Sequence, residues 1–169
     1  MVERTLLFIK PDGVQRGISG EIITRFEKVG LKIVGMKMVV VNKKFLEEHY
    51  NDVAERHGQA ILNQLLEYGT MGPVIAMVLE GVNGIDLVRK MCGPTEPKSA
   101  APGTIRGDFT HVNYAFADKS KQAIRNVVHR SGSLKEAEFE IYHWFNDDEL
   151  FTYDSAHDLH ILHKKKETE

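Results

Sequence analysis

Apolar residues along the chain fall into continuous runs and into stretches spaced at three to four positions. Continuous runs at residues 5–9 and 74–79 predict buried strands, because Pro and Gly residues bound them. The second run has no polar position, so it predicts a central strand covered on both faces. Residues 31–41 mix Ile, Val and Met with lysines, which predicts a longer strand with one exposed side. A turn is expected at residues 10–13, where Lys10 ends the first strand.

The helical spacing predicts several helices between these strands. They are expected at residues 20–29, 45–50, 54–68, 118–125 and 133–145, with a further helix between Asn83 and Gly93. Ser133 and Glu136 have the spacing of a capping box at the start of the last helix. Residues 126–129 read as a short extended segment. Residues 95–117 contain Pro and Gly with little periodicity, which predicts a long loop that is either functional or disordered.

The composition is typical of a soluble globular protein. The chain has 169 residues, 42% hydrophobic and 27% charged, which suits one domain with a sizeable core. A net charge of -2 gives no basic field for nucleic acid or membrane, so a polyanionic ligand needs a local cluster of Lys and Arg. One cysteine, Cys92, excludes an intrachain disulfide. With no signal-type apolar start, we expect a cytoplasmic setting.

One domain is expected over residues 1–155, followed by a polar tail at 156–169. The spacing of His157, His160 and His163 could bring three imidazoles onto one helical face. No acidic or thiolate partner accompanies them at fixed geometry, so a metal site is not favoured. The basic run Lys164-Lys165-Lys166 is expected to be solvated.

The segment from Asn126 to Ser133 holds the strongest candidate for chemistry. An imidazole is half-deprotonated at about pH 6.5 and nucleophilic above it, so His129 could hold a phosphoryl group on nitrogen. These eight residues by themselves also fit a structural or simply exposed histidine, so other segments must decide between the two interpretations.

Four blocks together resemble the nucleoside diphosphate kinase family. They are residues 9–17 (IKPDGVQRG), 49–52 (HYND), 102–109 (PGTIRGDF) and 126–129 (NVVH), within a likeness from Glu3 to about Tyr153. Asn-x-x-His alone is common, whereas four blocks in this order are specific. The resemblance implies a ferredoxin-like α/β (α+β) sandwich: a four-stranded antiparallel sheet with helices on one side, and a loop that serves as active-site wall and oligomer contact.

The resemblance also implies a ping-pong reaction in which a nucleoside triphosphate, mainly ATP, phosphorylates His129 and a nucleoside diphosphate then collects the phosphoryl group. The implied nucleotide-binding residues are Lys10 and Arg106 at the moving phosphoryl group, Arg89 and Thr95 at the distal phosphates, and Asn126 near the sugar hydroxyls. Phosphoryl transfer depends on positioning and charge stabilisation, which Lys and Arg supply. Mg²⁺ is implied as cofactor, held mainly by nucleotide phosphates, so we assign it no protein ligand.

Supporting roles around the histidine follow from the same resemblance. Glu140 would hold the other ring nitrogen of His129 and so fix which nitrogen attacks. The neighbouring partners would be Tyr50, Asp52 and Ser131. A homo-oligomer, tetramer or hexamer, is implied. The ordinary alternatives are a strand-end surface lysine at Lys10, a surface ion pair at Arg106 and a solvated helix position at Glu140.

The chain departs from the family pattern at three places. Arg130-Ser131-Gly132 follows His129 where the family has Gly-Ser-Asp, so a carboxylate is missing and a cation is added. No Phe stands near residues 57–58, where the family places a base-stacking aromatic ring. An insertion at about residues 110–122 carries Tyr114 and Phe116; one of these rings is expected to stack on the base, and the alternative is packing in the core or a subunit contact.

Two other functions remain open from the sequence. The altered residues 130–132 could belong to a nucleotide-binding or regulatory oligomer on the same fold that has lost turnover. A nucleic-acid-binding module is the second alternative, and the near-neutral charge and the lack of a basic stripe argue against it.

Overall fold

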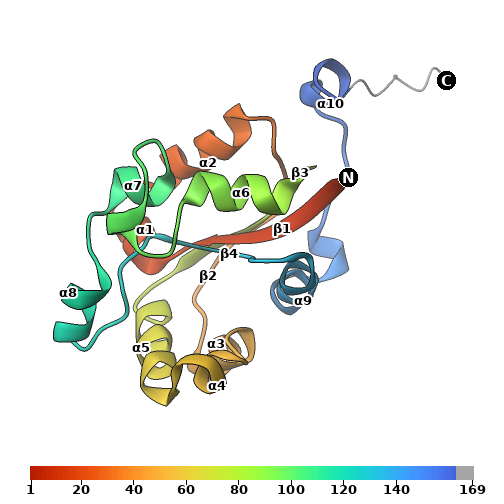
Figure 1. Cartoon of the computed structure of the whole chain (residues 1–169). Coiled ribbons are helices and arrows are strands. Elements are labelled where there is room, and N and C mark those ends of the chain that lie inside the picture. Colours follow the sequence, from red (N-terminus) through yellow and green to blue (C-terminus); the bar gives the residue numbers. More distant parts are fainter. Residues whose placement is uncertain (163–169) are drawn as a thin grey trace.

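The computed structural model describes residues 1–162 and contains a four-stranded antiparallel sheet with the order β2-β3-β1-β4 (Figure 1). The strands are β1 (Val2–Ile9), β2 (Lys32–Val39), β3 (Val74–Val82) and β4 (Val128–Arg130). Within this sheet β1 is central, and its Phe8 lies opposite Ala76 of β3 and His129 of β4. The predicted four-stranded, ferredoxin-like α+β architecture is therefore confirmed.

Helices connect the strands and pack on the sheet. The longer ones are α2 (Ser19–Lys28), α3 (Lys43–His49), α5 (Gln59–Gly69), α6 (Gly84–Cys92) and α9 (Leu134–Trp144). The shorter ones are α1 (Pro11–Gln15), α4 (Val53–His57), α7 (Ile105–Phe109), α8 (Tyr114–Lys119) and α10 (Ala156–His160), with 3-10 turns η1 (Pro97–Ser99) and η2 (Asp147–Glu149).

Both faces of the sheet are covered, so the expectation of helices on one side only is wrong. Successive β1 side chains point to opposite faces: Leu6 and Phe8 belong to one core cluster, and Leu7 and Ile9 to the other. Helices α3, α5 and α9 supply the first cluster, and α2, α6 and α7 supply the second (Figure 1). The continuous apolar runs of β1 and β3 require this two-sided burial.

Three local differences from the sequence prediction have simple causes. The expected turn at residues 10–13 is the start of α1, with Pro11 in its first turn. Proline is well tolerated there, because a backbone N–H in the first turn has no partner within the helix. The expected helix at 54–68 is broken into α4 and α5 at Gly58, whose φ of 89° lies outside the helical region. The long loop contains η1, α7 and α8, and α8 replaces the helix expected at 118–125.

The start of α9 forms only half of the predicted capping box. Ser133 Oγ accepts a hydrogen bond from the Glu136 backbone N–H at 3.2 Å. The Glu136 carboxylate accepts from the Gly132 N–H at 2.8 Å instead of turning back to Ser133. Gly132 allows this approach, since a Cβ there would lie 2.7 Å from Glu136 Oε2.

After residue 155 the chain forms the short helix α10, which contacts the rest of the protein through one buried side chain. In α10, Asp158 is buried and lies 3.2 Å from Lys32 Nζ, which also pairs with Glu80 at 2.9 Å. Between residues 1 and 162, neither His157 nor His160 joins a cluster of three metal-ligand side chains, and His163 and the basic run at 164–166 lie outside the described residues. No helix within the same range is long and apolar enough to cross a membrane.

Candidate active site

A tight turn at Val127 leads the chain into the candidate site. Val128 N–H donates to the Asn126 carbonyl at 2.7 Å around Val127, whose φ is +69°. This is the geometry of a strained γ-turn, and a positive φ in a β-branched residue costs on the order of 1–3 kcal/mol. The Val127 carbonyl accepts from the Lys10 backbone N–H at 2.8 Å. The turn thus joins the end of β1 to the start of β4, bringing Lys10 and Asn126 together.

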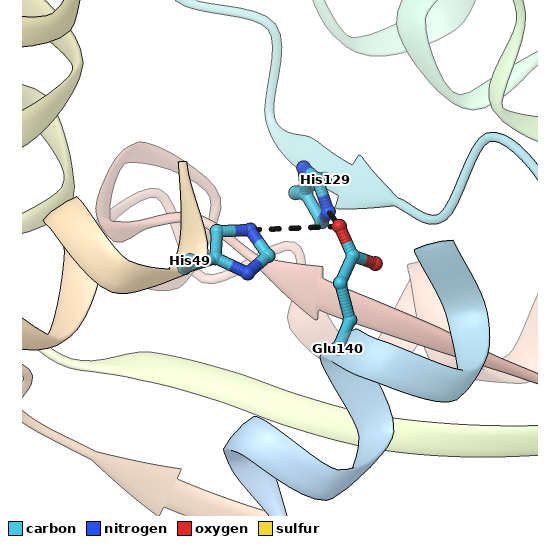
Figure 2. A group of neighbouring side chains, drawn as sticks. All are labelled: His49, His129 and Glu140. Carbon is cyan, nitrogen blue, oxygen red and sulfur yellow. Dashed lines mark hydrogen bonds and ion pairs between the residues drawn. The ribbon is translucent and has the colours of Figure 1, made fainter. Parts of the chain in front are cut away.

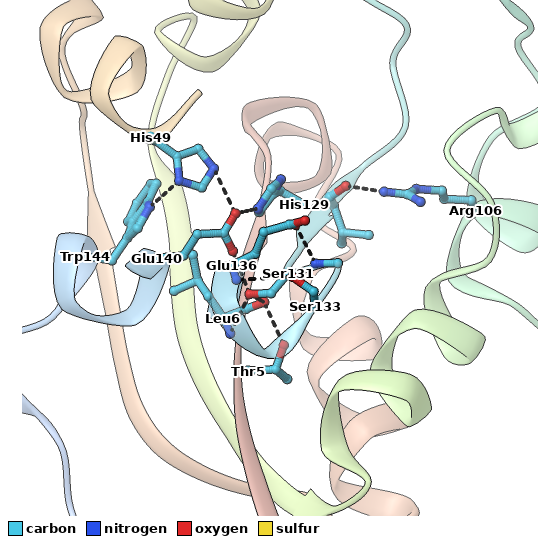
Figure 3. A network of polar contacts seen from close by, with 12 residues as sticks. Thr5, Leu6, His49, Arg106, His129, Ser131, Ser133, Glu136, Glu140 and Trp144 are labelled. Atoms are coloured by element: carbon cyan, nitrogen blue, oxygen red, sulfur yellow. Dashed lines mark hydrogen bonds and ion pairs between the residues drawn. The ribbon is translucent and has the colours of Figure 1, made fainter. Parts of the chain in front are cut away.

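His129 is held by packing on one side and by a carboxylate on the other. Its ring stacks on Phe8 with a centroid distance of 4.7 Å. Its Nε2 lies 2.8 Å from Glu140 Oε1, as Figure 2 shows. The other oxygen of Glu140 accepts from Ser131 Oγ at 2.5 Å (Figure 3). Because an ionised carboxylate can only accept, Nε2 of His129 carries the proton and Nδ1 keeps its lone pair.

The surroundings keep this imidazole neutral. Burial, followed by the positive charges of Lys10, Arg130 and Arg106, holds the pKa of His129 well below its usual value. Burial raises the pKa of Glu140, while His49 and Ser131 act in the opposite direction. At neutral pH the ring therefore offers an unprotonated nitrogen rather than an imidazolium.

Two buried cations lie in the same part of the molecule. Lys10 Nζ donates to Asn126 Oδ1 at 2.7 Å, and burial followed by the charge of Arg106 lowers the pKa of Lys10 to about 7. Arg106 is 4% exposed and donates to the backbone carbonyls of Gly93 and Val128 at 2.8 Å and of Asn126 at 3.2 Å. Neither cation forms an ion pair within residues 1–162. Their charge is free to attract an anion.

A cavity of about 530 Å³ opens in front of His129, which is within the size range of small-ligand sites. Six of the predicted site residues line it: Lys10, Tyr50, Thr95, Arg106, Asn126 and His129. Ser131 and Glu140 are buried behind the imidazole and act through it. Lys10, Arg106 and His129, which the resemblance assigned to one reaction, thus share one cavity.

Some predicted residues lie elsewhere. Arg89 does not line the cavity but donates to the Gly132 carbonyl at 2.5 Å. Asp52 pairs with Arg56 at 2.8 Å on the surface, with more than half of its side chain exposed. Of the two inserted aromatic residues, Tyr114 lines the cavity, whereas Phe116 is 63% exposed and does not.

His49 is the neighbour that the sequence left without a role. Its side chain is fully buried, and its Nε2 lies 3.8 Å from Glu140 Oε1 (Figure 2). The ligand atoms of His49, His129 and Glu140 lie within 4.8 Å of one another, which is close enough to suggest a metal site. Nδ1 of His49 accepts a hydrogen bond from Trp144 Nε1 at 3.2 Å, so the proton of the neutral His49 ring is on Nε2. The two nitrogens that face the Glu140 carboxylate, Nε2 of His49 and Nε2 of His129, therefore both carry protons. These nitrogens have no lone pair to offer, so the three side chains do not form a set of free metal ligands.

A neutral histidine facing a nucleotide-sized cavity beside two buried cations is the arrangement expected of an enzyme that moves phosphoryl groups. The family model described as nucleoside diphosphate kinase matches residues 3–150, and the chain belongs to this family.

Individual relatives support the same family assignment. The chain is 53% identical over 156 residues to the nucleoside diphosphate kinase of Pyrococcus abyssi, covering 92% of each chain. Its fold is similar to a Borrelia burgdorferi nucleoside-diphosphate kinase described as a transition-state mimic with bound vanadate and ADP, with a TM-score of 0.91 and 42% identity over 94% of this chain and 96% of that one. The fold is also similar to a Halobacterium salinarum nucleoside diphosphate kinase in complex with CDP. The TM-score is 0.81 and the sequence identity 39%, over 94% of this chain and 97% of that one.

The protein is accordingly a phosphotransferase that passes the terminal phosphoryl group of a nucleoside triphosphate to a nucleoside diphosphate. The alternative of a regulatory oligomer without turnover is not favoured.

Proposed function

We propose that His129 carries the phosphoryl group between the two nucleotides on Nδ1. The supporting observation is that Glu140 binds Nε2 while the ring lines the cavity. The Nδ1 lone pair attacks the γ-phosphorus, and the bond to the bridging oxygen breaks as the diphosphate leaves with the electron pair. A terminal oxygen of the second diphosphate then attacks the same phosphorus, and the nitrogen–phosphorus bond breaks.

Lys10 and Arg106 are proposed to neutralise the phosphoryl oxygens as charge builds on them. Their unpaired positive charges and their place in the cavity support this assignment. Asn126, whose amide bridges Lys10 and the Thr95 carbonyl, is proposed to face the sugar hydroxyls. Arg89 is proposed to reach the distal phosphates by leaving the Gly132 carbonyl.

Magnesium is the proposed cofactor, and the cavity fits an ion that arrives with the nucleotide. Among the described residues only Asp118 and Glu136 bring carboxylates to the lining, and Glu136 already accepts from the Gly132 N–H. Such sparse oxygen ligands suit an ion held by phosphate oxygens and water. Glu136 partly replaces the carboxylate that the family carries at position 132, since it occupies the space above Gly132. When bound, the ion supplies further neutralisation of phosphate charge.

A ping-pong reaction has a kinetic signature that tests the proposal. Initial rates are measured while the triphosphate and the diphosphate are both varied. Free phosphoenzyme between two half-reactions predicts parallel double-reciprocal lines. Intersecting lines would indicate direct transfer between two bound nucleotides and would contradict a carrier histidine.

Tyr114 is proposed to stack on the base, in place of the aromatic ring missing near residues 57–58. It lines the cavity, as do Ile61 and Leu65 of α5. Tyr114→Ala is expected to raise KM for several diphosphates about tenfold, because stacking is worth about 1–3 kcal/mol for any base. Phe116→Ala is the matched control and should leave KM unchanged, since its ring lies outside the cavity lining. Equal KM values in the two variants would contradict the stacking role.

A homo-oligomer, tetramer or hexamer, is proposed together with a cytoplasmic location. The edge strand β2 exposes Met36 and Met38, at 54% and 59%, and Val40 follows at 74%. An exposed apolar strand edge favours association. Light scattering is expected to give four or six times the chain mass of 19.2 kDa. A monomer mass would refute the proposal. The unpaired Cys92 suits a reducing compartment.

A further inference from the structure

A hydrogen bond from Trp144 determines the tautomer of His49. The indole N–H can only donate, and it lies 3.2 Å from His49 Nδ1 (Figure 3). Burial, followed by the charge of His129, holds the pKa of His49 well below its usual value, so the ring is neutral. A neutral imidazole that accepts at Nδ1 carries its proton on Nε2.

The resulting Nε2–H is buried and has no hydrogen-bond partner within the described chain. It lies 3.8 Å from Glu140 Oε1. The same oxygen lies 2.8 Å from Nε2 of His129 (Figure 2). An unsatisfied buried donor in a native structure calls for an explanation, and here it points at the carboxylate that holds the proposed nucleophile.

We propose that His49 is a positioning residue for phosphoryl transfer, which keeps Glu140 ionised and aimed at His129 through its fixed Nε2–H. The inference rests on the proposed role of His129. Attack by Nδ1 places positive charge on the His129 ring, and only an ionised Glu140 stabilises that charge. A carboxylate that faces additional N–H and O–H donors stays ionised more easily, and a small shift would bring His49 within hydrogen-bond distance.

Other groups around Glu140 do not duplicate this donor. The titratable or charged groups that face Glu140 and His49 are Lys10 at the end of β1, Tyr50 after α3, His129 and Arg130 on β4, and His143 on α9. His143 uses Nε2 to contact the Phe45 carbonyl at 2.9 Å. Ser131 already binds the opposite oxygen, Oε2. Arg130 Nε is also buried without a hydrogen-bond partner. Among the described residues, however, the basic side chains within 4 Å of the Glu140 carboxylate are His129 and His49, and only the second of these has a free N–H.

The pH dependence follows from the charge of Glu140. Burial raises its pKa, and the carboxylate supports catalysis above that pKa and fails as the pH falls through it. Removing the His49 donor raises this pKa further. The acid limb of the kcat profile therefore moves to higher pH.

Two substitutions test the inference against a purely structural role. His49→Phe keeps a buried ring but removes the N–H, and is expected to lower kcat about tenfold at neutral pH and to move the acid limb up by about one unit. His49→Gln retains an amide donor and an acceptor for Trp144, and should restore the acid limb to within a few tenths of a unit of the wild-type position. If both variants lose kcat alike with no shift in the profile, the positioning role is refuted.

A spectroscopic measurement on the intact wild type removes any dependence on folding of the variants. ¹⁵N-histidine spectra report which ring nitrogen carries the proton, and His49 is expected to be protonated on Nε2. A proton on Nδ1 would overturn the inference. If wild-type His129 carries no phosphate after incubation with a triphosphate, both the proposed function and this inference are overturned. If the phosphoenzyme forms normally but the pH profile of kcat in His49→Phe is unshifted, only the inference is overturned.

Discussion

His129→Ala is expected to abolish nucleotide-dependent turnover, with a fall in kcat of about 10⁴-fold or more. A carrier nucleophile splits one reaction into two steps, and no other described histidine combines a free ring nitrogen, a bound carboxylate and a place in the cavity next to Lys10. A coupled assay with ATP and a second diphosphate measures the loss. Thermal unfolding should show a folded protein, because the variant keeps the Phe8 core.

His111→Ala provides a matched control for the loss of an imidazole. His111 is exposed in the inserted segment and does not line the cavity. Its replacement should leave kcat within about twofold, on the scale of ordinary surface substitutions. Substantial turnover in a folded His129→Ala protein would contradict the proposed mechanism.

Lys10→Met is expected to lower kcat by about 10²–10³-fold, the usual effect of removing one preorganised donor from a site of developing charge. The buried Lys10 amine lies 2.7 Å from Asn126 Oδ1 and has no carboxylate partner within residues 1–162. Methionine keeps the length of the side chain without its charge. The exposed Lys43→Met is the control and should behave as wild type.

The pH profile gives a second measurement on Lys10. Burial lowers its pKa to about 7. The amine is charged below that pKa, so its contribution to kcat/KM of the free enzyme is lost as the pH rises through it. Bound phosphates favour the charged form of Lys10, so the basic limb of the kcat profile should lie at higher pH than the basic limb of the kcat/KM profile. Both limbs are expected to disappear in Lys10→Met, and their persistence would assign the titration to another group.

Features close together in the sequence were well predicted. The apolar runs of β1 and β3 identified the central strands, and the first of them placed Lys10 at the end of a core strand. The resemblance of four blocks then brought together Lys10, Arg106 and His129, which occupy one cavity. Periodicity alone could not have done so, because it determines which face of an element is buried and not which elements meet.

Features that depend on tertiary contacts were missed. The left-handed Val127 contradicts the preference of a β-branched residue and persists because the core and the Lys10 N–H hold it. The contact between Trp144 and His49 joins residues 95 positions apart and gives no local pattern. The contact between Asp158 of α10 and Lys32 of β2 likewise joins distant residues and gives no local pattern.

The most direct test of the account is to isolate the phosphoenzyme. Incubation with triphosphate labelled at the γ-phosphorus, without diphosphate, is expected to give one acid-labile phosphate per chain, which peptide mass spectrometry places on His129. A different unlabelled diphosphate should remove the label and become the labelled triphosphate. Label on another residue, or label on His129 that no diphosphate removes, would contradict the role of His129 as carrier.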